Sequence, residues 1–174
     1  KIGAKDPIHP NDHVNMGQSS NDTFPTAMQL AACVEIRTML IPKLTSMQKS
    51  LKAKARKWNK IVTVGRTHLM DATPIRVGQI FSGYAAAIEY GIRRAERAMM
   101  RLADNMPIGG TAVGTGMNTH PKFATMVCRE LSKSTRVSFT EAHNHFEAQA
   151  TRDCVVEAHG ELKTIATSFS KIAN

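Results

Sequence analysis

Polar side chains that could bind an anion are concentrated near the start of the chain. The segments His9-Pro10-Asn11-Asp12 and Gln18-Ser19-Ser20-Asn21-Asp22 stand directly ahead of an apolar helical pattern. Hydroxyls, an amide and free backbone N–H groups at the start of a helix can bind a carboxylate. The structural alternative is that Asn21 or Asp22 caps this helix, with Pro25 in its first turn. That alternative explains one or two polar residues but not the pair of serines.

A second polar segment contains the candidate proton carrier. Gly65-Arg66-Thr67-His68 follows a short extended stretch and precedes Asp71-Ala72-Thr73-Pro74, so we expect His68 in a loop between helices. An imidazole titrates near neutral pH and is the usual proton carrier there, although a single histidine is often only structural. Thr67 beside it could bind one substrate oxygen.

The glycine-rich segment from Gly109 to Gly116 superficially resembles a phosphate cradle. No strand is expected before it and no Gly-Lys-Ser/Thr follows, which argues against nucleotide binding. We expect instead a tight turn where the backbone approaches another group closely.

His143 and His145 lie two residues apart with no carboxylate or cysteine to complete a metal site, so both are expected to be structural and no metal is expected.

Composition excludes several classes of protein. The 174 residues carry 23 Lys+Arg against 14 Asp+Glu, and 42% are hydrophobic, which argues against disorder. No apolar run reaches the roughly 18 residues of a membrane span. Three scattered cysteines fit neither a disulfide framework nor a zinc site, so we expect a reducing, intracellular setting.

The net charge of +9 suggests an acidic partner without choosing between nucleic acid and small carboxylates. Four basic residues share one helical face, Lys49, Lys52, Arg56 and Lys60, and this face is expected to be solvated. A nucleic-acid patch would need interleaved aromatic residues, and this region offers only Trp58.

Helical periodicity dominates the elements that must position these residues. Apolar residues repeat at steps of three and four over 33–58, 81–106 and 155–172, and a shorter helix is expected over about 121–134. Pro42 should kink the first of these patterns. Residues 60–64 form the only strand candidate, ending at Gly65. The predicted class is therefore all-α, a bundle of long helices in which some apolar faces pack against other subunits.

The motifs taken together, in this order and spacing, resemble class II fumarases of the fumarase/aspartase superfamily. The resemblance runs from about His9 to Asn174 and rests on the polar segments quoted above and on residues 109–118. Within that superfamily, aspartases typically have Gln where His68 stands and Thr where Ser20 stands. This chain therefore resembles the fumarases more closely.

The resemblance implies a fold, a reaction and an assembly. Residues 1–19 would be the end of the N-terminal domain and a connecting loop, and residues 20–174 part of the central helical domain. The implied reaction is the reversible trans hydration of fumarate to (S)-malate in the tricarboxylic acid cycle, without metal or organic cofactor. The family's flexible loop, Gly-Ser-Ser-x-Met-Pro-x-Lys-x-Asn, carries its carbon base and does not occur in this sequence, so the chain is expected to be an inactive piece of a homotetrameric enzyme.

The resemblance also implies roles for individual residues. By the family pattern, Ser19, Ser20, Asn21 and Thr67 bind the substrate carboxylates, and His68 handles the proton on the hydroxyl side. His9, Asn11 and Asp12 match a second dicarboxylate site, for which a structural turn is the alternative. Each active site of the family draws its residues from three subunits, so Ser19–Asn21 and Thr67–His68 of one chain would serve different sites.

Three other functions remain as alternatives. One is an aspartase-like ammonia lyase of the same superfamily, one a basic helical nucleic-acid binder, and one a helical oligomerisation or interaction domain without activity. The fumarase interpretation predicts fumarate and malate as ligands, no nucleic-acid or membrane partner, and a location in the cytoplasm, or in the mitochondrial matrix of a eukaryote.

Overall fold

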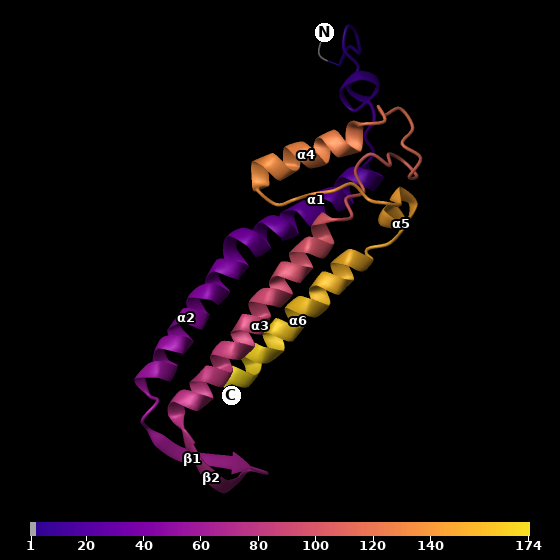
Figure 1. Ribbon diagram of the computed structural model, residues 1–174. Helices are drawn as coiled ribbons and strands as arrows, with labels where there is room; N and C mark the ends of the chain where they lie inside the picture. The colour runs from indigo at the N-terminus through magenta and orange to yellow at the C-terminus, as the bar shows by residue number, and fades with distance from the viewer. Residues whose placement is uncertain (1–2) are drawn as a thin grey trace. The chain divides into compact units, whose positions relative to one another are not determined.

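The computed structural model describes residues 3–174, apart from the side chain of Asn11, and it is predominantly helical (Figure 1). Six α-helices, two π-helical turns and two strands follow one another among these residues: η1 Pro10–Val14, α1 Ser20–Glu35, η2 Ile36–Leu40, α2 Ile41–Lys57, β1 Val62–Thr67, β2 Met70–Arg76, α3 Val77–Ala103, α4 Phe123–Thr135, α5 His145–Ala150 and α6 Asp153–Ala173. The helices expected from the periodicity are all present. The predicted helical class is confirmed.

The chain forms two compact units. Unit 1 comprises Lys1–Glu35 and Met99–Ala158, and unit 2 comprises Ile36–Ala98 and His159–Asn174. The boundaries between them fall at the end of α1 and inside α3 and α6. Each unit is therefore built from segments that are far apart in the sequence.

Unit 2 is a bundle in which α2, the first part of α3 and the last part of α6 run side by side (Figure 1). Its core residues come from the predicted apolar seams: Leu44, Leu51, Ala85, Ile88, Ala95 and Ile165. The alanines in this list are small enough to let helices approach closely. Gly78, at the start of α3, lets this helix approach the end of α2 closely, because a Cβ on Gly78 would collide with the carbonyl oxygen of Ala55.

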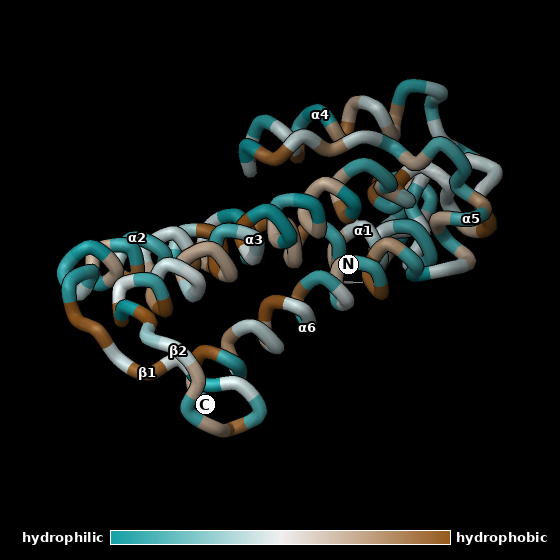
Figure 2. The backbone as a smooth tube through the Cα atoms, turned by 60° about the horizontal axis from the view of Figure 1, so that its bottom comes forward, coloured by the Kyte–Doolittle hydropathy of each residue, from teal (hydrophilic) through white to brown (hydrophobic). Residues whose placement is uncertain are grey.

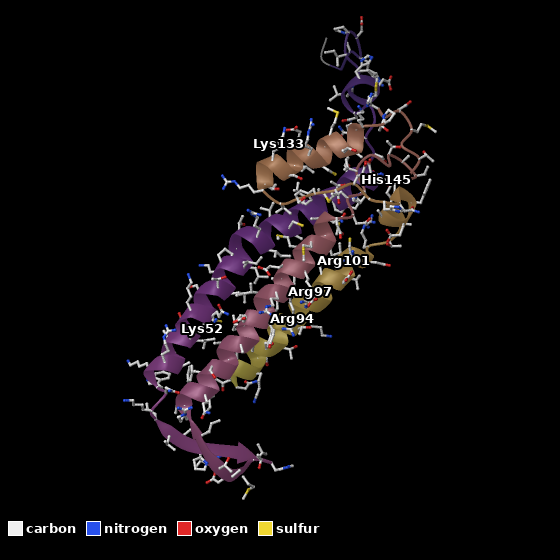
Figure 3. All side chains as sticks on the ribbon, in the orientation of Figure 1. Lys52, Arg94, Arg97, Arg101, Lys133 and His145 are labelled. Carbon is white, nitrogen blue, oxygen red and sulfur yellow. The ribbon has the colours of Figure 1, made fainter. Side chains whose placement is uncertain are left out.

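Charged residues at the edge of this core link its helices. Glu89 on α3 accepts hydrogen bonds from Gln48 (2.9 Å) and Lys52 (3.2 Å) of α2. The hydrogen bond and charge of Lys52, together with Arg93, hold the pKa of the Glu89 carboxyl below its usual range. Arg94 and Arg97 extend from α3 beside α6 (Figure 3), where Arg97 lies 2.9 Å from Glu161.

The basic face of α2 is exposed to solvent, as predicted. Lys49, Lys52 and Arg56 are exposed on α2, and Figure 2 shows hydrophilic residues along much of this helix. Lys60 is also exposed, but it lies beyond the end of α2 at Lys57, so the expectation that it shares this helical face was wrong. Lys52 is engaged by Glu89. Lys49, Lys52 and Arg56 therefore form part of the outer face of an amphipathic helix.

The expected interruption at Pro42 is a π-helical turn. Residues Ile36–Leu40 form this turn, and α2 begins at Ile41 with Pro42 in its first turn. Proline is tolerated there because the first N–H groups of a helix have no partner within the helix.

The segment from Gly65 to Pro74, expected as a loop between helices, is mostly strand, and only His68 and Leu69 form a turn. This segment completes an antiparallel hairpin in which Thr63 pairs with Ile75 and Thr67 with Met70, with a bulge at Gly65/Arg66. The predicted strand at 60–64 is thus the start of a longer one. β-Branched residues on both strands favour the pairing, and Pro74 is tolerated because a two-stranded sheet consists only of edges.

Unit 1 contains α1, the end of α3, α4, α5 and the start of α6. Its buried residues include Cys33, Leu102, Met106, Cys128 and Phe139. Gln29 of α1 is 2% exposed, and its Nε2 donates to the carbonyl oxygens of Leu102 (2.9 Å) and Asn105 (3.0 Å). Gln29 thus gives hydrogen-bond partners to carbonyl groups at and just after the C-terminus of α3. None of the helices within residues 3–174 is both long and apolar enough to cross a membrane.

Candidate functional site at the start of α1

The N-terminus of α1 is capped by two hydrogen bonds between side chains and backbone N–H groups. Ser19 Oγ accepts from the backbone N–H of Asn21 (3.2 Å), and Asp22 Oδ1 accepts from the backbone N–H of Ser19 (3.0 Å). The bond from the Ser19 N–H to the Asp22 carboxylate is one half of a capping box, whereas Ser19 Oγ binds the second rather than the third N–H of the helix. The capping residue is therefore Ser19, and the expectation that Asn21 or Asp22 takes that position was wrong, as was the placement of Pro25 in the first turn.

Several groups at this terminus stay available to a ligand. Ser20 is exposed, and its hydroxyl takes part in no hydrogen bond among the described residues. Asn21 Nδ2 donates one hydrogen bond to the carbonyl oxygen of Ala112 (2.8 Å), which leaves its second N–H available. These donors lie at the positive end of the helix dipole, where a carboxylate would be stabilised.

Two hollows adjoin these residues. One, of about 580 Å³, is lined by residues 15–19 together with Asp12, Thr111, Ala112, Met117 and Asn118. The other, of about 360 Å³, is lined by Asn15, Gln18, Ser19, Ser20 and Thr23. Ser19 contributes to both. The structure therefore brings Ser19, Ser20 and Asn21 together at a surface with space for a small molecule.

Asp22 is the residue at this site whose role the sequence analysis missed. Its side chain is fully buried, and Oδ2 accepts from the backbone N–H groups of Gly109 (3.0 Å) and Thr111 (2.9 Å). Gly109 and Thr111 both have positive φ, 97° and 56°. Two N–H groups converging on one oxygen form an anion-binding concavity of the kind called a nest. The glycine-rich loop that superficially resembles a phosphate cradle therefore does bind an anion, but this anion is the protein's own Asp22 carboxylate.

The glycine-rich loop also packs as closely as predicted. A Cβ on Gly110 would collide with the side-chain oxygen of Gln149, and one on Gly114 would lie 2.7 Å from Phe146 Cδ1. Gln149 Nε2 donates to the carbonyl of Thr111 (2.6 Å). Both Phe146 and Gln149 belong to α5, which the sequence analysis did not anticipate. Asn144 caps α5, and its Oδ1 accepts from the N–H of Glu147 (3.0 Å).

The segment proposed as a second dicarboxylate site forms a compact turn. His9 Nδ1 accepts from the backbone N–H of Asp12 (3.1 Å), and His13 Nδ1 accepts from that of His9 (2.8 Å). The Asp12 carboxylate is largely exposed, 3.4 Å from His9 Nδ1. The side chain of Asn11 lies outside the described residues. The structural alternative thus accounts for much of this segment.

Thr67 and His68 lie in unit 2, at the tip of the hairpin. Thr67 ends β1, while His68 and Leu69 form the turn with φ of 52° and 64°. Positive φ at both central positions is typical of the tight turns that join antiparallel strands. His68 is exposed, and its ring makes no hydrogen bond among the described contacts. Ser19, Ser20 and Asn21 belong to unit 1, so the two groups of candidate residues are carried by different units.

Of the two histidines expected to be structural, His143 is exposed, whereas His145 has a partner in another segment. His145, labelled on α5 in Figure 3, places Nδ1 3.1 Å from the carbonyl oxygen of Pro107. Within the described part of the chain, no cluster of three or more His, Cys, Asp or Glu residues could hold a metal ion. The three cysteines are free thiols.

A family model described as lyase (Lyase_1) matches residues 1–174. The chain belongs to this lyase family. It is 53% identical over its full length to the mitochondrial fumarate hydratase of Rhizopus oryzae, and 52% identical over 167 residues to the class II fumarate hydratase of Nitrosomonas europaea. It spans 35% and 36% of those relatives, about a third of their length.

Solved structures of the same lyase family share this fold. The class II fumarase from Schistosoma mansoni superposes with a TM-score of 0.92 at 34% identity, covering 97% of this chain and 38% of that one. A fumarate lyase:delta crystallin from Brucella melitensis, bound to cobalt, superposes with a TM-score of 0.90 at 35% identity, covering 99% of this chain and 37% of that one. The resemblance to class II fumarases inferred from the motifs is confirmed.

Proposed function

We propose that this chain is part of a class II fumarate hydratase, which adds water reversibly across the double bond of fumarate to give (S)-malate. The observation that carries the proposal is its identity of 53% and 52% to fumarate hydratases over all or nearly all of its length. Because the chain spans about a third of those relatives, the activity is that of the longer protein.

The chemistry assigns a role to each candidate residue. Dehydration of malate removes a proton from the carbon next to a carboxylate and so turns that carboxylate into an aci-carboxylate with two negative charges, which needs preorganised donors around it. Ser19, Ser20 and Asn21 supply hydroxyl and amide donors at the start of α1, and Thr67 supplies a further hydroxyl. Together they would fix the orientation of the dicarboxylate.

His68 would act on the opposite side of the double bond. In dehydration its ring would give a proton to the departing hydroxide, and in hydration it would take a proton from the attacking water. Its exposed ring at the turn supports this role, because no described contact occupies either ring nitrogen. His9, Asn11 and Asp12 remain a proposed second dicarboxylate site, with the Asp12 carboxylate lining the larger hollow.

The proposed function also implies the domains to which these residues belong, the assembly of the full-length protein and its location in the cell. Residues 1–19 would end an N-terminal domain and residues 20–174 would belong to a central helical domain of a homotetramer. Fumarate and malate would be its only ligands, without nucleic acid or membrane. Relatives from bacteria and relatives named mitochondrial support a location in the cytoplasm or the mitochondrial matrix.

The test uses the full-length parent protein and the ultraviolet absorbance of fumarate. The wild-type protein should consume fumarate without releasing ammonia from aspartate, and His68→Asn should lower kcat by about 10²–10⁴-fold, the usual value of a positioned proton carrier. His143→Asn, which alters another exposed histidine, should leave kcat unchanged.

Two results would contradict the proposal. A full-length wild type that leaves fumarate unchanged would overturn the function, and an unaltered kcat in His68→Asn would remove His68 from the mechanism. Circular dichroism of the variants verifies that folding is retained. The 174-residue chain by itself is expected to be inactive.

A further inference from the structure

We infer that Asp22 is a positioning residue of the fumarate site, which fixes the substrate-binding serines by holding them against the loop 109–112. The inference rests on the proposed function and extends it to a residue that touches no substrate. It follows from the contacts of one carboxylate whose oxygens each bind a different segment.

The first contact fixes the binding residues themselves. Asp22 Oδ1 accepts from the backbone N–H of Ser19 at 3.0 Å, so the carboxylate sets the backbone immediately before Ser20. Ser19 in turn accepts the N–H of Asn21 through its hydroxyl. Losing Asp22 Oδ1 would therefore release the backbone of Ser19, on which the positions of Ser20 and of the Asn21 N–H depend, although none of the three residues is itself changed.

The second contact fixes the opposite wall. Asp22 Oδ2 accepts from Gly109 and Thr111, and Asn21 Nδ2 donates to the neighbouring Ala112. Thr111 and Ala112 line the hollow shared with Ser19. The carboxylate is thus placed between the loop and the helix terminus and determines their separation.

The loop needs this partner to keep its conformation. Thr111 is β-branched and has a φ of 56°, a conformation that such residues rarely adopt unless the surroundings impose it. Its own hydroxyl is buried without a hydrogen-bond partner among the described atoms. The stabilisation comes instead from its backbone, since Asp22 binds its N–H and Gln149 binds its carbonyl.

Neutralising Asp22 changes both the charge near the site and the positions of the binding residues, and these two changes should shift the KM for fumarate in opposite directions. A carboxylate near a site for dianions repels them, so loss of its charge alone should tighten substrate binding. Loss of positioning should have the opposite effect. A raised KM after neutralisation therefore reports the geometry and cannot come from the change in charge.

Asp22→Asn in the full-length parent protein is the main test. An amide keeps the size of the side chain but offers one oxygen acceptor where the carboxylate has two, so either the Ser19 bond or the loop bonds are lost. We expect the KM for fumarate to rise on the order of tenfold to a hundredfold, with a smaller fall in kcat, because misplacement of about 1 Å can cost that much.

Gln29→Met is the matched control. Gln29 is also buried on α1 and holds backbone groups of another segment, but its partners Leu102 and Asn105 are not among the residues lining the two hollows. Both variants should have a lower melting temperature. Only Asp22→Asn should have a raised KM, since a purely structural defect reduces the folded fraction and leaves KM unchanged.

The possible outcomes separate the inference from the function on which it rests. A wild type without hydratase activity overturns the proposed function, whereas an active wild type with an unchanged KM in Asp22→Asn overturns only the inference. If Asp22→Asn does not fold, Gln149→Met decides, because it removes the other bond to Thr111. A raised KM there supports the inference, and an unchanged KM overturns it.

Discussion

Buried ionisable side chains in this protein are stabilised in two different ways. Asp22 accepts three backbone N–H groups, which replace the water that a carboxylate would otherwise bind. Among the described contacts, no N–H group donates to the thiols of Cys33 and Cys128. Burial, with the nearby Cys154, raises the pKa of Cys33 to about 12, and burial, with Glu141, raises the pKa of Cys128 to about 11.

The raised pKa values predict unreactive thiols. At pH 8 a raised pKa leaves the thiol neutral, and the thiolate is the form that reacts. We expect iodoacetamide to modify Cys33 and Cys128 at least about a hundredfold more slowly in the folded full-length protein than in urea. Mass spectrometry of the separate peptides measures each rate. Equal rates with and without urea would show that these thiols are not buried.

At the scale of elements, the hairpin carries His68 on a turn whose two residues are not glycine although both adopt a left-handed conformation. His68 and Leu69 both have positive φ, and Leu69 is 95% exposed, so its side chain gains nothing from packing. A left-handed conformation costs a residue other than glycine roughly 1–2 kcal/mol. The hairpin therefore carries a local cost next to its proposed catalytic histidine, as functional segments often do.

Leu69→Gly should stabilise the hairpin. Glycine adopts positive φ without the steric cost but loses more chain entropy on folding, so we expect a net gain of about 0.5–1 kcal/mol in the opening free energy. Hydrogen exchange of the amides of β1 and β2 in the full-length protein measures this free energy.

Met70→Gly is the control for that experiment. Met70 is also exposed but lies in β2, where glycine should destabilise the hairpin by about 0.5–1 kcal/mol. If Leu69→Gly destabilised the hairpin as Met70→Gly does, the left-handed turn would be contradicted.

At the scale of the whole molecule, the two groups of proposed site residues are carried by different units. Ser19, Ser20 and Asn21 lie in unit 1, whereas Thr67 and His68 lie in unit 2. In the proposed homotetramer, one subunit would supply the first group and another subunit the second group to each active site.

This arrangement predicts that two inactive variants restore each other. Asn21→Ala and His68→Asn of the full-length protein should each be nearly inactive, but hybrids formed by coexpression should contain sites with both wild-type groups. Random assembly of equal amounts would place both in about a quarter of the sites. The expected activity is therefore about a quarter of the wild-type value per subunit, measured by fumarate absorbance.

The separate variants mixed without subunit exchange provide the control. Coexpressed hybrids no more active than that mixture would show that each chain supplies both groups to the same site.

Local physical rules determined much of this protein from the sequence alone. Helical periodicity located α2, α3, α4 and α6, because apolar residues three and four apart share one face. The interruption at Pro42 followed from its missing donor. Ser19, Ser20 and Asn21 stood out because donors ahead of a helix are a local pattern.

Tertiary structure decided what depends on residues distant in the sequence. The hairpin needed the pairing of 62–67 with 70–76, and its turn at His68 and Leu69 lacks the Asn-Gly signal that reveals such turns. The role of Asp22 was hidden for the same reason: its partners Gly109 and Thr111 lie more than eighty residues away, at separations of 87 and 89. A polar residue at the start of a helix looks the same in sequence whether it binds only its own helix or also a remote loop, and only the folded chain shows that Asp22 does both.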